Sequence, residues 1–259
     1  MMLEAQSISQ TVQGNPVLHH ISLRFDEGRF YGIIGPNGVG KSTLLHILTG
    51  TDVPSTGNVL LDGKRLPDLP RKTLARQMAV LQQGGLPPVG FSVREVVGMG
   101  RYPYQNWLGG EVEDDQPIID EALAVMGLID LQSRKLHQLS GGERQRVALA
   151  KLMVQKPEIL LLDEPTTYLD IGYQIGLLDT VRAWQQKQGL LVIAVLHDLN
   201  LAALYCDEII ALHEGTVAAV GTPEEVIVPE IIDHIYNTKT IMIKHPLTGV
   251  PQLILQPGI

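Results

Sequence analysis

The sequence predicts an α/β fold built on a mainly parallel sheet with helices on both faces. Three short apolar runs carry this prediction: FYGIIG at 30–35, EILLLDE at 158–164 and LLVIAVLHD at 190–198. Each run is continuously apolar, as expected for a strand buried on both faces, and each is followed by a segment of helical period. This is the pattern of buried parallel strands joined by crossover helices.

The remaining segments divide the chain further. Residues 3–30 alternate apolar and polar positions around a turn at QGNP, which predicts an antiparallel β edge. Between 84 and 138, Pro, Gly and acidic residues interrupt the helical pieces VREVVGMG and IIDEALAVMGLI, which predicts an inserted α-helical subdomain. We therefore expect a core of residues 1–83 and 139–221, a subdomain at 84–138, and a C-terminal extension at 222–259 packed on the core or stabilising a dimer.

Composition excludes several classes of protein. With 44% hydrophobic and 19% charged residues, the chain is that of a folded globular protein. Its net charge of −8 argues against nucleic-acid binding, so bound anions have to be held by local geometry. The acidic run Glu111–Asp115 predicts a solvated helix entrance. Cys206 is the only cysteine, which favours a reducing compartment and a buried, inert thiol.

No segment suggests secretion or membrane insertion. The first thirty residues lack a basic start followed by an apolar run, so we expect the mature protein to begin near Met1. The apolar runs stop well short of the roughly 20 residues that span a bilayer. Any work at a membrane is therefore expected to go through a partner.

A phosphate-binding loop is predicted at residues 35–43. The segment GPNGVGKST follows the strand FYGII and opens a helix, which is the context that such a loop requires. Its glycines let successive N–H groups surround a β-phosphate, Lys41 reaches the β- and γ-phosphates, and the Ser42 hydroxyl binds Mg²⁺. The candidate nucleotide-binding residues here are Gly35, Pro36, Asn37, Gly38, Val39, Gly40, Lys41, Ser42 and Thr43.

Two adjacent carboxylates end the strand ILLLDE. Neighbouring side chains on a strand point to opposite sides, so we expect Asp163 in the water shell of the metal and Glu164 facing an attacking water. His197 follows the third apolar run. Because ligands of open α/β sheets lie beyond the carboxyl ends of the strands, we expect Lys41, Glu164 and His197 at one crevice. An acidic turn and a surface histidine are the alternatives.

The segment LSGGERQR begins a further helix with Ser140, Gly141 and Gly142, and free N–H groups at a helix start favour a phosphate. The loop at 35–43 leaves one flank of a γ-phosphate uncovered. We expect a second copy of the chain to cover it with its serine–glycine helix, which gives two sites in a symmetric dimer. An ordinary helix cap is the alternative.

Together, GPNGVGKST, LSGGERQR, LLLDEPTTYLD and the HD after a strand resemble the motifs of ATP-binding-cassette ATPases, in order and spacing. The resemblance implies a RecA-like P-loop NTPase core that binds ATP and Mg²⁺. It makes Glu164 the general base for water and His197 the γ-phosphate sensor. It also places Asp170 in the loop that crosses the dimer interface and Glu143 in the signature that contacts the nucleotide.

The glutamine of VLQQ resembles the one that links the metal to the helical subdomain, and we prefer Gln83, with Gln82 as the alternative. One departure concerns the base. The family usually stacks an aromatic residue on adenine near the first strand, where SISQTVQG offers Gln10 and Val12. We therefore predict modest discrimination between ATP and GTP.

A finer resemblance is carried by VREVVGMGRYPY, VIAVLHDLNLAALYCDEIIALHEG, GTPEEVI and HPLTGVPQLI. These segments resemble importer ATPases for iron–siderophore complexes, haem and cobalamin, with the ferrichrome-type iron-hydroxamate member foremost. The resemblance implies a homodimer on the cytoplasmic face of the inner membrane, beneath permease subunits fed by a binding protein, with no nucleic acid bound. Haem or cobalamin import, an export ATPase, and a soluble cassette protein of repair or translation are the alternatives.

Overall fold

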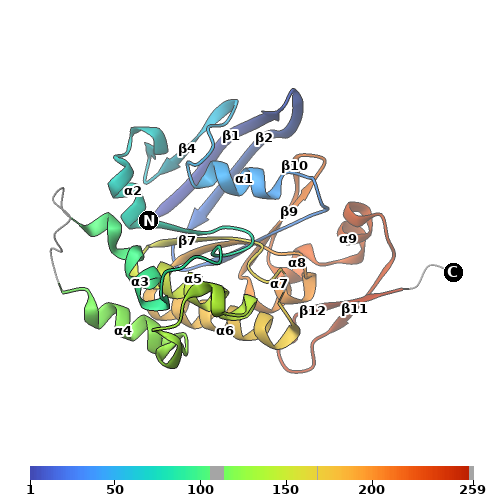
Figure 1. Cartoon of the computed structure of the whole chain (residues 1–259). Coiled ribbons are helices and arrows are strands. Elements are labelled where there is room, and N and C mark those ends of the chain that lie inside the picture. Colours follow the sequence, from blue (N-terminus) through green and yellow to red (C-terminus); the bar gives the residue numbers. More distant parts are fainter. Residues whose placement is uncertain (106–113, 168, 257–259) are drawn as a thin grey trace. The chain divides into compact units, whose positions relative to one another are not determined.

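The computed structural model describes residues 1–105, 114–167 and 169–256 (Figure 1). The chain divides into a first unit, Met1–Leu69 with Arg182–Ile259, and a second unit, Pro70–Val181. The segment 84–138, expected to be a helical subdomain, lies inside the second unit. Among the described residues, no helix is long and apolar enough to cross a membrane.

An antiparallel sheet forms the first part of the first unit, in the order β2-β1-β4-β5 (Figure 1). Gln13 and Gly14 both have positive φ, of 50° and 82°, and make the tight turn between its first two strands. The antiparallel edge predicted at 3–30 is confirmed, and a second pair of strands extends it. The strands are β1 (Met2–Val12), β2 (Asn15–Asp26), β4 (Thr56–Leu61) and β5 (Lys64–Arg65).

Parallel strands form the second sheet of this unit. Strand β3 pairs in parallel with β8 and with β9, and β10 adds an antiparallel edge. Every residue of β3 and β8 is buried, which confirms the predicted strands at these two apolar runs. The strands are β3 (Phe30–Ile34), β8 (Leu191–Val195), β9 (Glu208–His213) and β10 (Thr216–Gly221). The helices are α1 (Lys41–Leu48), the C-terminal part of α6 (Ile171–Gln188), α7 (Leu199–Tyr205), α8 (Pro223–Val226) and α9 (Pro229–Tyr236).

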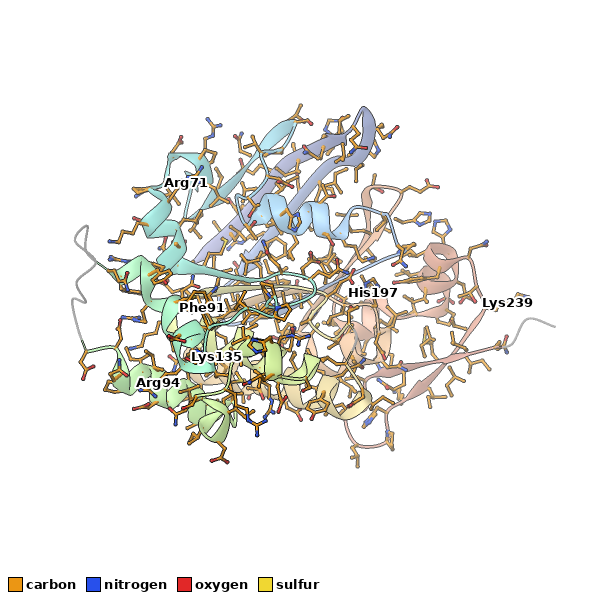
Figure 2. All side chains as sticks on the ribbon, in the orientation of Figure 1. Arg71, Phe91, Arg94, Lys135, His197 and Lys239 are labelled. Carbon is orange, nitrogen blue, oxygen red and sulfur yellow. The ribbon has the colours of Figure 1, made fainter. Side chains whose placement is uncertain are left out.

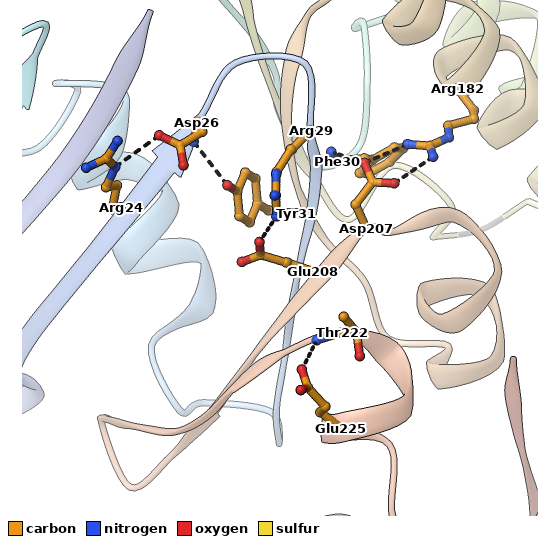
Figure 3. A network of polar contacts seen from close by, with 10 residues as sticks. All are labelled: Arg24, Asp26, Arg29, Phe30, Tyr31, Arg182, Asp207, Glu208, Thr222 and Glu225. Atoms are coloured by element: carbon orange, nitrogen blue, oxygen red, sulfur yellow. Dashed lines mark hydrogen bonds and ion pairs between the residues drawn. The ribbon is translucent and has the colours of Figure 1, made fainter.

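Polar contacts fix the amino ends of β3 and β9 (Figure 3). Arg182 in α6 donates to both carboxylate oxygens of Asp207, at 2.6 and 2.9 Å, and Asp207 also accepts from the Phe30 N–H at 2.8 Å. Burial alone would raise the pKa of Asp207, but the hydrogen bonds from Arg182 and Phe30 lower it. Arg29 pairs with Glu208 alongside. These contacts anchor the amino end of β3, the strand that leads into the loop at 35–43.

Cys206 lies just before β9 and is buried, as predicted. A Cβ added at Gly32, in the middle of β3, would lie 2.7 Å from the Cys206 sulfur. Glycine at this position therefore makes room for the thiol. Burial raises the pKa of the Cys206 thiol, so the reactive thiolate form is suppressed.

The second unit combines one pair of parallel strands with helices. Strand β6 (Met78–Leu81) pairs in parallel with β7 (Ile159–Asp163), which confirms the strand predicted at ILLLD. The predicted helical pieces are also confirmed, and Figure 2 labels Phe91, Arg94 and Lys135 on this part of the unit. The helices are α2 (Arg71–Gln77), α3 (Val93–Gly98), α4 (Gln116–Val125), α5 (Gly141–Val154) and the N-terminal part of α6, with 3₁₀ turns at Met99–Tyr104, Ile129–Leu131 and Leu136–Gln138.

A buried ion pair corrects one prediction. Asp115, expected at a solvated helix entrance, accepts a hydrogen bond from Arg101 Nε at 2.7 Å, and the two side chains are only 7% and 5% exposed. Arg101 also donates to the Val154 carbonyl at 3.0 Å and stacks on the Tyr104 ring. Asp115 is therefore buried because its carboxylate pairs with the buried Arg101 guanidinium. Asp114 is exposed, as predicted, and residues 111–113 lie outside the described residues.

We expect Arg101→Met to destabilise the second unit by about 3–5 kcal/mol, because it leaves the Asp115 charge buried without its partner. Urea unfolding followed by circular dichroism measures the change. Arg94→Met is the matched control, since Arg94 pairs with Asp120 at the surface, where the side chains are 33% and 62% exposed, and also donates to Gln116 and Gln132. Its loss leaves no buried charge and should cost less than about 2 kcal/mol. Equal destabilisation by the two variants would contradict the prediction.

Candidate functional site

The predicted phosphate loop joins β3 to α1 in the first unit. Gly35 has φ 146°, and a Cβ added there would lie 2.4 Å from the Leu212 carbonyl oxygen, so only glycine fits. Lys41 is the first residue of α1 and is 5% exposed. Its ammonium donates to the carbonyl oxygens of Gly35 and Pro36 at 2.8 and 2.9 Å. The loop thus holds the lysine against its own backbone.

His197 follows β8 in the same way that Gly35 follows β3. The parallel register pairs Ile33 with Val195, so Gly35 and His197 each lie two residues beyond this pair. His197 is exposed, and Figure 2 labels it. Within the first unit, the predicted phosphate loop and the predicted sensor therefore follow the carboxyl ends of neighbouring strands, where ligands of such sheets bind.

The second unit brings Gln83 and Glu164 together. In the parallel pair of β6 and β7, Leu81 lies opposite Leu162, and Gln83 and Glu164 are two residues further along their strands. Gln83 Nε2 donates to Glu164 Oε2 at 2.6 Å, and Thr167 Oγ1 donates to the same oxygen at 3.2 Å. Of the two glutamines considered, Gln83 makes this contact.

The turn that carries Glu164 is unusual. Its φ of 49° lies in the left-handed region, which is sparsely populated by residues other than glycine and is often found at functional sites. Gln145 in α5 donates to the Pro165 carbonyl at 3.0 Å and so connects the turn to this helix, which begins at the segment LSGGERQR. Asp163 is buried and Glu164 is only partly buried, so the two carboxylates have different surroundings, as different tasks would require.

Ser140 is the N-cap residue of α5. Its hydroxyl accepts from the Glu143 N–H at 3.3 Å, while the Glu143 carboxylate accepts from the Ser140 N–H at 2.7 Å. The hydrogen bond from this backbone N–H lowers the pKa of Glu143. Ser140 and Gly141 are exposed. The helix-cap alternative thus describes Ser140 within its own chain, and a role toward a nucleotide stays a prediction.

Asp170 occupies a similar position before α6. Its carboxylate accepts from the Tyr173 N–H at 3.0 Å, and its carbonyl accepts from the Gln174 N–H at 2.9 Å. The residue is exposed. These bonds fix the backbone of the predicted interface loop, of which residue 168 lies outside the described part.

Sequence reasoning missed three side chains that contact the predicted site. Gln145 and Thr167 lie inside the motifs LSGGERQR and LLLDEPTTYLD but carried no assigned role. Tyr236 lies in no motif, yet its hydroxyl accepts the Gly35 N–H at 2.9 Å. The first two could have been found from their place in the motifs. The contact of Tyr236 with Gly35 joins positions 201 residues apart, and no local sequence pattern predicts it.

The fold and these residues define a phosphate-loop nucleotide-binding protein. Residues 18–167 match the ABC transporter family. The hemin import ATP-binding protein of Gloeobacter violaceus is 40% identical, covering 99% of this chain and 98% of its own length. The petrobactin import ATP-binding protein of Bacillus anthracis is 38% identical, covering 97% and 92%. This chain belongs to the ABC transporter family of ATP-binding proteins.

Two further comparisons bear on size and assembly. The chain spans 58% of the length of an ABC transporter ATP-binding protein of Bacillus subtilis, YvrA, to which it is 40% identical. A bacterial ABC transporter cassette, solved as a dimer, superposes with a TM-score of 0.74 at 28% identity, covering 85% of this chain and 98% of that one. The predicted fold class is confirmed.

Proposed function

We propose that this chain is the ATP-hydrolysing subunit of an ABC importer that drives uptake of an iron(III)–siderophore complex, of the hydroxamate type, through a partner permease. The observation that carries the proposal is the hydrogen bond between Gln83 and Glu164, the two residues that we propose as the metal-linked glutamine and the general base. The relatives named for hemin and petrobactin import support an iron chelate as the solute.

In this proposal the loop at 35–43 holds the phosphates of ATP, with Lys41 turning from its backbone carbonyls to the β- and γ-phosphates. Ser42, Gln83 and Asp163 offer hydroxyl, amide and carboxylate oxygens, the hard ligands that suit Mg²⁺. Bound Mg²⁺ would neutralise phosphate charge during hydrolysis. Glu164 orients and deprotonates the attacking water, and His197 contacts the γ-phosphate.

The proposed assembly is a homodimer with ATP between the protomers. Ser140, Gly141, Gly142 and Glu143 of one copy cover the nucleotide held by the other, and Asp170 lies at the interface. Exposure of Ser140 and Gly141 at the start of the 14-residue α5 supports this arrangement. ATP closes the dimer by binding its closed state more tightly, and hydrolysis releases it. The dimer sits on the cytoplasmic face of the membrane beneath permease subunits supplied by a binding protein.

Uptake assays test the solute. Cells that lack this chain are complemented with wild type or Lys41→Ala and are given radiolabelled ferrichrome, haem or cobalamin. We expect ferrichrome uptake only with the wild type. Uptake of haem or cobalamin instead would leave the proposed importer ATPase in place and change the transported solute. If cells that lack this chain take up all three solutes normally, and instead are sensitive to DNA damage or defective in translation, a soluble cassette protein would be favoured.

Hydrolysis of ATP and GTP at equal concentrations should differ by less than about five-fold, because the segment SISQTVQG at the end of β1 contains no aromatic side chain for base stacking, an interaction worth about 1–3 kcal/mol. Gln10 is held by Ser55, whose N–H it accepts at 2.7 Å, and Val12 is aliphatic. Phosphate release is measured, with Lys41→Ala as the background for contaminating enzymes. A preference for ATP of more than about 50-fold would contradict this prediction.

A further inference from the structure

Two elements beyond residue 228 contact segments of the first unit that belong to the predicted nucleotide site: the phosphate loop and the segment after His197. Helix α9 ends at Tyr236, and the hairpin of β11 (Thr240–Lys244) and β12 (Pro251–Leu255) follows it (Figure 1). The role of this C-terminal extension was left open by the sequence. Its contacts with the phosphate loop and with the segment after His197 give it one.

The first contact is made at the start of the phosphate loop. The Tyr236 hydroxyl accepts the Gly35 N–H at 2.9 Å, while the Gly35 carbonyl accepts from the Lys41 ammonium at 2.8 Å. The two peptide planes that meet at Gly35 are thus held by two side chains. Because glycine has more backbone freedom than any other residue, the two bonds remove conformations of Gly35 that it would otherwise adopt. Tyr236 therefore restricts the backbone conformation at the start of the loop.

Tyr236 is itself well anchored. Ile232 and Ile235 bury one face of α9, and Asn237, the C-cap residue that follows the helix, has φ 49° in the left-handed region. Asp233 accepts from the Thr240 hydroxyl at 2.6 Å, which ties the helix to the strand that follows. Burial raises the pKa of Tyr236 to about 12, so its hydroxyl stays neutral at physiological pH.

The second contact lies beside the predicted sensor. Asp198, the residue after His197, caps α7 by accepting from the N–H groups of Asn200 and Leu201. The Asn200 side chain makes two hydrogen bonds with the backbone of β12. Its Nδ2 donates to the Leu253 carbonyl at 3.2 Å, and its Oδ1 accepts the Leu253 N–H at 2.6 Å. The extension thus holds both segments that follow the carboxyl ends of β3 and β8.

We propose that Tyr236 is a positioning residue through which the C-terminal extension pre-organises the phosphate loop and so sets the affinity of the site for Mg–ATP. This inference rests on the proposed role of residues 35–43 in binding ATP. In this proposal Tyr236 acts through the Gly35 backbone. Its bond removes loop conformations that cannot bind, and a smaller competent fraction would lower the apparent affinity in proportion.

The test is Tyr236→Phe, which keeps the ring and removes only the hydroxyl. We expect the dissociation constant for Mg–AMP-PNP to rise measurably, by about 5-fold at most, because the worth of one net hydrogen bond sets the upper limit of the effect. The proposal requires the Gly35 bond to be equally strong in the bound and transition states, so KM for ATP should rise while kcat stays within about two-fold. Calorimetric titration and phosphate release measure the two effects.

Tyr31→Phe is the matched control. The buried Tyr31 hydroxyl also accepts a backbone N–H, from Asp26 at 3.0 Å, at the opposite end of β3 (Figure 3). Removing it should lower thermal stability by a similar amount and leave nucleotide binding unchanged. Equal weakening of binding by both variants, or none by Tyr236→Phe, would overturn the inference. Failure of the wild type to bind Mg–AMP-PNP would instead overturn the proposed function.

Hydrogen exchange on the wild type provides a measurement that does not depend on any variant folding. The nucleotide-free protein should protect the Gly35 amide strongly relative to Asn37 and Gly38, the exposed residues further along the loop. Exchange of Gly35 as fast as theirs would show that the Tyr236 bond does not persist in solution, and would overturn the proposal.

Discussion

Glu164→Gln should bind ATP, form a stable ATP-bound dimer and hydrolyse ATP at least about 100-fold more slowly than wild type. The amide keeps the size of the side chain and its place beside Gln83 but cannot accept a proton from the attacking water, and loss of a positioned base typically costs 10²- to 10⁴-fold. With hydrolysis blocked, the closed state is not released. Phosphate release gives the rate, and size-exclusion chromatography with Mg–ATP gives the dimer.

Glu158→Gln is the control for this variant. It makes the same chemical change on an exposed carboxylate just before the other end of β7, away from the turn at Glu164. It should turn over ATP like the wild type. Brisk hydrolysis by Glu164→Gln would remove Glu164 from the role of general base.

Ser140→Ala should reduce ATP turnover about 100-fold, because a hydroxyl that contacts the γ-phosphate across the dimer would be lost along with the cap of α5. Loss of the cap alone is expected to cost about 1 kcal/mol of stability. The two effects can be separated, because the chain contains a second capping box of the same kind.

Ser92→Ala provides that separation. Ser92 caps α3 and exchanges hydrogen bonds with Glu95, just as Ser140 does with Glu143. The two variants should therefore lose similar stability in urea unfolding. Only Ser140→Ala should lose turnover and the ATP-dependent dimer. If Ser140→Ala hydrolyses ATP as fast as Ser92→Ala, the serine serves its own helix alone and the proposed covering of the nucleotide is wrong.

Local patterns in the sequence predicted the buried central strands and the helical pieces of the fold. Continuous apolar runs identified β3, β7 and β8 because strands buried on both faces leave no room for polar positions. The phosphate loop was found because its glycines and lysine are adjacent in sequence. The prediction for Asp115 failed, because the arginine that buries it lies 14 residues away and the acidic run gave no sign of it.

Long-range contacts at the site could not be predicted in this way. The pairing of Gln83 with Glu164 depends on the register between β6 and β7, which places positions 81 residues apart side by side. Tyr236 reaches Gly35 from a helix that carries no recognised motif. Motifs named the residue types that the chemistry needs, whereas the structure shows which of their atoms meet within each unit.

The packing of Cys206 against Gly32 has a practical consequence. Because the only thiol of the chain is buried against β3, alkylating reagents can modify it only when the packing around it opens. The rate of labelling thus reports spontaneous local opening beside the strand that leads into the phosphate loop, with no engineered probe. Cysteines introduced on the surface can also be tagged selectively while the native one is left in place.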